Sequence, residues 1–138
     1  MNSYSLIVSL HVIAVILGLG PVSVLVIATS GALPTPYPYD RIGRLMRFSV
    51  RGLLAVLATG AAAIAMTHGA MGEGLWMKAS FGLFLLLGFL HGLGRRLLGK
   101  AQQDPSQAPP PVAVRWIFRS MCVVIVMITW LMEAKPWW

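Results

Sequence analysis

Four long apolar segments divide this chain of 138 residues, and they constrain its fold more than any other feature. They cover about residues 4–30, 48–71, 75–98 and 114–132. Because a helix rises about 1.5 Å per residue, roughly 20 apolar residues cross the hydrocarbon core of a bilayer. Hydrophobic residues make up 57% of the chain and charged residues only 11%, too few charges to cover such a surface in water. The sequence therefore predicts an all-α integral membrane protein, one domain over residues 1–138, folded as an antiparallel four-helix bundle.

Basic residues gather in two of the three connections between these segments, which predicts how the chain is oriented. The connections after the first and third segments carry the basic clusters: Arg41, Arg44, Arg47 and Arg51, then Arg95, Arg96, Lys100, Arg115 and Arg119. The second connection carries Glu73 and no lysine or arginine before Lys78. Because cytoplasmic loops are enriched in lysine and arginine, both termini are expected on the outer, periplasmic side of a bacterial inner membrane. The same clusters account for the net charge of +7 without a nucleic-acid partner, and the lipid bilayer is the expected partner.

Four ionisable side chains stand within the apolar segments: His11, His68, Lys78 and His91. Hydrocarbon is a costly place for a charge or an unpaired imidazole, so such residues usually face the bundle interior, pair with one another or hold a ligand. With the orientation above, His11, His68 and Lys78 are expected in the outer half of the bundle. His91 is expected near the cytoplasmic surface, one turn before Arg95.

Two histidines at matching depth favour a haem site. The first two segments are joined by a short connection and should form antiparallel neighbours, so His11 and His68 can face each other across the bundle. Two imidazoles placed in this way can take both axial positions of a haem b, whose flat, apolar ring suits a helix bundle in lipid. Small residues would leave room for the ring: Gly18, Gly60 and Ala63.

Other interpretations of these residues stay open. A histidine near a membrane interface can simply hydrogen-bond a backbone carbonyl or a headgroup. The long side chain of Lys78 can extend toward the outer surface, and His91 can extend toward the cytoplasmic one with its arginine neighbours. Thioethers also bind Cu(I), so a copper site is an alternative to haem. The methionines toward the outer side are Met66, Met71, Met77 and Met132.

Three stretches resemble a superfamily of small four-helix bacterial membrane proteins. They are LHVIAVILGLGP, GLWMKASFGLFLLLGFLHG and WLMEAKP, which contain His11, Lys78 and His91. The superfamily includes copper-resistance D proteins, HemJ-type protoporphyrinogen oxidases and an uncharacterised branch, which this chain resembles most. The resemblance to the oxidase branch implies that His11 is associated with haem and Lys78 with activity. Met77 stands where that branch has a histidine, so the resemblance implies a haem site more than the oxidase reaction itself.

The resulting hypothesis is a haem b-binding inner-membrane protein that transfers electrons or oxidises a lipophilic substrate near the outer leaflet. His11 and His68 are the expected iron ligands, with His91 as an alternative. Lys78 would neutralise a haem propionate or an anionic substrate and, as a buried amine, transfer a proton in catalysis. Two alternatives remain: a non-catalytic subunit or assembly factor of a larger membrane complex, and a copper-handling protein. A membrane redox partner and a homo-oligomer are both compatible with the sequence.

Overall fold

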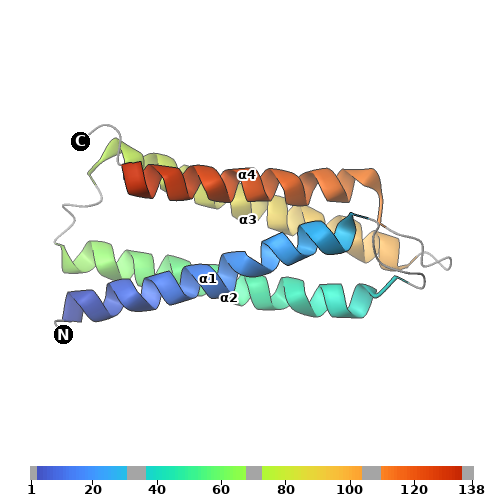
Figure 1. The fold of residues 1–138 in the computed structure, drawn as a ribbon, viewed down its shortest axis with the longest axis horizontal. Helices are drawn as coiled ribbons and strands as arrows, with labels where there is room; N and C mark the ends of the chain where they lie inside the picture. The colour runs from blue at the N-terminus through green and yellow to red at the C-terminus, as the bar shows by residue number, and fades with distance from the viewer. Residues whose placement is uncertain (1–2, 31–36, 68–72, 104–109, 135–138) are drawn as a thin grey trace.

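The computed structural model describes residues 3–30, 37–67, 73–103 and 110–134, and these residues form an antiparallel bundle of helices (Figure 1). The helices are α1 (Ser3–Thr29), α2 (Tyr39–Met66), α3 (Leu75–Gln102) and α4 (Val112–Ala134). Each of the four is long and apolar enough to cross a membrane. The prediction of a small all-α membrane protein with four spans in a bundle is confirmed at this level.

Helix α2 differs from its predicted bounds, because it begins at Tyr39 rather than at about residue 48. The prediction followed the apolar stretch alone, whereas the arginine-rich segment before it is also helical. In that segment the buried residues Ile42, Met46 and Ser49 recur at helical spacing, with arginines between them. The helix ends at Met66, and residues 68–71 of the predicted segment lie outside the described part of the chain.

The bundle is built from two helical hairpins. Helix α1 packs along α2, and α3 packs along α4; the hairpins meet mainly through α1 and α4, and the α2–α3 contact is the least extensive. The first two helices are thus antiparallel neighbours, as predicted. The start of α1 and the end of α4 share one end of the bundle, called the terminal end here (Figure 1). The opposite end, where α2 and α4 begin and α3 ends, is called the arginine end.

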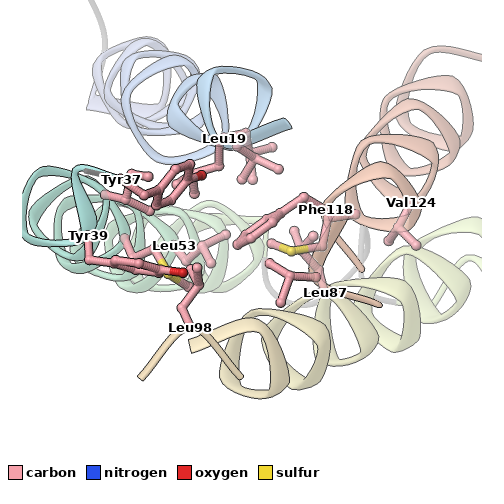
Figure 2. Close-up of a cluster of buried hydrophobic side chains, with 14 residues drawn as sticks. Leu19, Tyr37, Tyr39, Leu53, Leu87, Leu98, Phe118 and Val124 are labelled. Carbon is pink, nitrogen blue, oxygen red and sulfur yellow. The ribbon is translucent and has the colours of Figure 1, made fainter. Parts of the chain in front are cut away.

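The interior is closed by apolar side chains from all four helices. Val22 and Leu25 of α1 and Phe118 and Met121 of α4 have no exposed surface. Figure 2 shows Phe118 pointing from α4 into the interior beside Leu87 of α3, with residues of the first hairpin opposite. Large apolar side chains also cover the outside of the bundle, among them Ile16, Ile27, Leu54, Phe89 and Val126. An apolar exterior of this kind is what a bundle surrounded by lipid requires.

Candidate ligand-binding cleft

Helices α1 and α2 touch backbone to backbone where two glycines meet. A Cβ atom on Gly18 would lie 2.6 Å from the carbonyl carbon of Gly52, and a Cβ on Gly52 would overlap the Cα of Gly18. Ser49 secures the crossing, because its buried hydroxyl donates a hydrogen bond to the Gly18 carbonyl oxygen at 2.9 Å. Small residues permit such close helix approach in membranes. The crossing fixes the register of the two helices, and that register sets the position of His11.

The crossing places His11 against Thr59, two turns of helix toward the terminal end. His11 Nδ1 lies 2.9 Å from Thr59 Oγ1, and the Thr59 hydroxyl donates to the Ala55 carbonyl oxygen at 2.7 Å. Because the hydroxyl of Thr59 donates within α2, the tautomer that suits this contact carries the proton on His11 Nδ1, which donates to the threonine oxygen. In that tautomer the lone pair of the imidazole is on Nε2.

Gly60 makes room for the imidazole on the surface of α2. A Cβ atom on Gly60 would lie 3.3 Å from His11 Cε1, closer than side-chain carbons normally approach. The histidine ring therefore rests on bare backbone, held by Thr59 from the neighbouring position. Of the small residues expected to leave room for a ligand, Gly60 borders His11, whereas Gly18 serves the helix crossing.

His11 opens onto a cleft between the two hairpins, called the His11 cleft here, with a volume of about 330 Å³. All four helices line it: His11, Val15 and Leu19 of α1; Val56, Leu57, Gly60, Ala61 and Ile64 of α2; Met77, Ser80, Phe81 and Phe84 of α3; Ile128, Thr129 and Met132 of α4. The hydroxyls of Ser80 and Thr129 donate to carbonyls of their own helices at 2.8 and 2.9 Å. Among these lining residues, His11 contributes the one side-chain nitrogen.

Lys78 is not among the residues that line the cleft. Its side chain is exposed on α3, whereas Trp76 and Ser80, two residues away on either side, are buried. Because successive helical residues are separated by about 100°, Lys78 is rotated by about 200° from both Trp76 and Ser80 and faces away from the interior. The expectation that Lys78 is buried is therefore wrong, and its neighbour Met77 faces the cleft instead.

His91 is buried in the interior rather than extended toward a surface. It is 2% exposed, and its Nε2 has no hydrogen-bond partner among the described residues. His91 is buried because it lies on the inward face of α3 together with Leu87, Gly94 and Leu98. Arg95 is exposed. The interpretation that His91 extends to the surface is therefore wrong. It is not among the residues lining the His11 cleft, so the structure does not bring the two histidines into one site.

His68 lies outside the described residues, so its predicted pairing with His11 stays a prediction. Within the described ranges, no group of three or more histidine, cysteine, aspartate or glutamate side chains could hold a metal ion. Two residues of this region were not anticipated: Thr59, which contacts His11, and Gly52, which meets Gly18 at the helix crossing. Both pairs could have been anticipated from the antiparallel register of α1 and α2. His11 precedes Gly18 by two helical turns, and Thr59 follows Gly52 by the same two turns.

The fold and the cleft together define a class, that of a small multi-pass membrane protein with four helices and an apolar cleft between two hairpins. Comparisons with protein-family models, with curated proteins and with solved structures find no match to this chain. The class therefore rests on the helices and the cleft alone.

Proposed function

We propose that this protein binds haem b in the His11 cleft, where His11 Nε2 would hold the iron. The observation that carries the proposal is the 2.9 Å contact between His11 Nδ1 and Thr59 Oγ1. Thr59 holds Nδ1, so the lone pair of Nε2 is left for a ligand. Metal-binding histidines regularly donate their other ring N–H to such a partner, which orients the imidazole.

The cleft suits a flat, apolar ligand. Its volume of about 330 Å³ is within the range of small-molecule sites, and its walls are aliphatic and aromatic apart from His11 and two hydroxyls. Phe81 and Phe84 of α3 supply two aromatic faces, and Gly60 keeps the imidazole free of steric contact with α2. A porphyrin brings four nitrogens to its iron, so the protein has to supply only axial ligands.

His68 remains the proposed second ligand, on the stretch that follows α2. Lys78, at the start of α3 beside a lining residue, remains the proposed partner of a carboxylate at the mouth of the cleft. A lysine side chain that is exposed on the bundle can extend along it toward the interface, where propionates or an anionic substrate would be found. His91 stays an alternative ligand only for a separate interior site.

When bound, haem b supplies one-electron redox chemistry at its iron. The side chains of the cleft hold and orient the group and exclude water. Because the exterior of the bundle is apolar, a lipophilic substrate can reach the cleft through the bilayer. We therefore assign electron transfer, or oxidation of a lipophilic substrate, as the activity of this site, within the membrane superfamily that the sequence resembles.

The proposed orientation places the arginine end in the cytoplasm and the terminal end, with the His11 cleft nearer to it, on the periplasmic side of a bacterial inner membrane. The support is the charge distribution: Arg41, Arg44 and Arg47 at the start of α2, and Arg95, Arg96 and Lys100 toward the end of α3. Positive residues of short loops are retained on the cytoplasmic side.

Haem titration of the purified apoprotein tests the assignment. Wild-type protein is expected to bind haem at one equivalent per chain, whereas His11→Ala loses this binding because no other nitrogen lines the described cleft. His91→Ala serves as the control, since it removes a histidine outside the cleft. Equal binding by wild-type protein and His11→Ala would remove the assignment.

A copper site is the second candidate, because Met77 and Met132 line the same cleft as His11. One imidazole and two thioethers form a donor set suited to Cu(I). Met66 is exposed, and Met71 lies outside the described residues. This candidate predicts that the Met77→Leu/Met132→Leu variant loses Cu(I) in competition with a Cu(I) chelator while haem binding persists. An unchanged Cu(I) affinity would remove copper from consideration.

A further inference from the structure

Two adjoining polar pockets lie at the arginine end, between the start of α2 and the end of α3. Their volumes are about 340 and 300 Å³. They share four lining residues: Tyr39, Asp40, Arg44 and Gln102. The first pocket adds Arg47 and the second adds Arg41. These adjoining pockets, called the arginine pocket here, are separate from the His11 cleft in both position and chemistry.

The lining of the arginine pocket carries an excess of positive charge. Three of its lining residues are arginines, with exposed side chains, and one, Asp40, is acidic. Gln102 Nε2 donates a hydrogen bond to Asp40 Oδ1 at 3.1 Å, which links α3 to α2 across the pocket. Asp40 is thus held by an amide from the neighbouring helix, and its single charge cannot balance three arginines. The excess of positive charge favours an anion from outside the chain.

A phosphate group fits this lining better than a carboxylate ligand does. Guanidinium forks bind phosphate oxygens through paired, charge-assisted hydrogen bonds, and a phosphate offers enough oxygens for more than one arginine. Arg41, Arg44 and Arg47 follow one another at intervals of three residues on α2, so their side chains emerge close together.

The surroundings of the pocket point to a lipid as the source of the phosphate. Phe48, directly after Arg47, is exposed, and Leu54 farther along α2 is exposed as well. On α4, exposed Trp116 lies at this end of the bundle with the Arg119 guanidinium 5.3 Å from its ring centre. Tryptophan and arginine mark the interface between hydrocarbon and headgroups. Exposed Phe48, next to Arg47, would therefore offer an apolar contact to an acyl chain of a lipid whose phosphate lies in the pocket.

We propose that the arginine pocket binds the phosphate of an anionic phospholipid headgroup. Arg44, which borders both pockets, and Arg47 are the principal ligands, with Arg41 completing the set. Asp40 limits the affinity, because its negative charge repels the phosphate. This inference is independent of haem binding.

Lipid binding by the detergent-purified protein tests the proposal, measured by native mass spectrometry with phosphatidylglycerol and phosphatidylcholine. The wild type is expected to retain phosphatidylglycerol in preference to phosphatidylcholine. Arg44→Gln/Arg47→Gln should weaken phosphatidylglycerol binding by roughly tenfold or more, because charge-assisted hydrogen bonds are lost. Asp40→Asn should strengthen it, since the one negative charge of the lining is removed.

The matched control is Arg95→Gln/Arg96→Gln, which removes the same charge toward the same end of the bundle from residues that do not line the pocket. An equal loss in both double variants would show attraction to a charged surface and overturn the site. Absence of a preference for phosphatidylglycerol in the wild type would also overturn it. Displacement of the lipid by millimolar inorganic phosphate would assign the pocket to free phosphate and overturn the lipid assignment. Unchanged thermal midpoints without lipid establish that the variants fold.

Discussion

The hydrogen bond between His11 and Thr59 is the residue-scale feature on which the haem proposal depends. Thr59→Val keeps the shape of the side chain and removes the oxygen that accepts from His11 Nδ1. We expect haem affinity to fall by roughly 10–100-fold, because the second ring nitrogen loses the partner that orients it. Thr129→Val is the control, since that hydroxyl also lines the cleft and, among the described residues, bonds the Ile125 carbonyl of its own helix rather than a histidine. Equal affinities of the two variants in haem titrations would show that Thr59 has no orienting role.

Tyr37, in the connection before α2, gives a residue-scale prediction that does not involve the cleft. Burial, and then the neighbouring Tyr39, raise the pKa of its phenol from 10.0 to about 12, against an opposing effect of Arg115. The hydroxyl also donates to the Ala28 carbonyl oxygen at 2.6 Å. The unfolded chain releases this proton near pH 10, so the stabilisation is complete below pH 10 and is lost as the pH rises toward 12.

The measurement is an alkaline titration followed by tyrosinate absorbance, in which the difference between wild type and Tyr37→Phe isolates this phenol. A transition near pH 12 is expected for the folded protein. A transition of the Tyr37 phenol at the ordinary value of 10.0 would show that the side chain is not buried against α1.

Single residues were the least predictable level of this molecule. His11 and Gly60 could be selected from the sequence, because an imidazole within an apolar span needs a partner and a glycine there leaves space beside the backbone. Lys78 was placed wrongly because composition does not tell which face of α3 turns inward. His91 was placed wrongly because the two arginines that follow it suggested a surface, whereas His91 is buried with Leu87, Gly94 and Leu98 while Arg95 and Arg96 are exposed.

At the scale of elements, the α1–α2 crossing depends on Gly18 and Gly52. Alanine at either position puts a methyl group into the backbone of the other helix, so we expect a loss of roughly 1–3 kcal/mol in stability. Gly20→Ala is the control, since nothing lies within 4 Å of its added Cβ and alanine favours the helix. Thermal unfolding in detergent checks this, and a Gly18→Ala protein as stable as Gly20→Ala would contradict the crossing.

Helix boundaries could be predicted only where the apolar stretch of the sequence and the helix end at the same residues. The long α1 was found almost entirely, because its apolar stretch and its helix coincide. The first turns of α2 were missed, since arginines alternate there with Ile42 and Met46, which are buried against the rest of the bundle. The amphipathic first turns of α2 contribute the arginines of the arginine pocket. The second proposed site therefore lies in the part of α2 that precedes its apolar stretch.

At the scale of the whole molecule, the proposed orientation can be tested by labelling. In a Cys122→Ala background without cysteine, Ser3→Cys at the terminal end and Gln103→Cys at the arginine end are both exposed positions. A membrane-impermeant maleimide added to intact spheroplasts should label Ser3→Cys and reach Gln103→Cys only after permeabilisation. The reverse pattern would show that the arginine end faces outward.

Four spans and their bundle could be predicted because lipid leaves so few alternatives for long apolar segments. The way in which the two hairpins pack together could not be predicted. Helices α2 and α3 are also joined by a short connection, yet they have the least contact of the neighbouring pairs. The His11 cleft is a consequence of that pairing, as its walls come from all four helices. The sequence therefore predicted that His11 lies within the bundle. The cleft beside His11 results from the packing of the two hairpins, which the sequence did not predict.

The optical spectrum of the detergent-purified protein, before and after dithionite, tests the central claim most directly. The protein should come from cells with an ample haem supply and be compared with His11→Ala prepared in the same way. The account predicts a sharp Soret band and resolved α and β bands on reduction in the wild type, and their loss in the variant. A featureless visible spectrum of correctly folded wild-type protein would contradict haem binding in the His11 cleft.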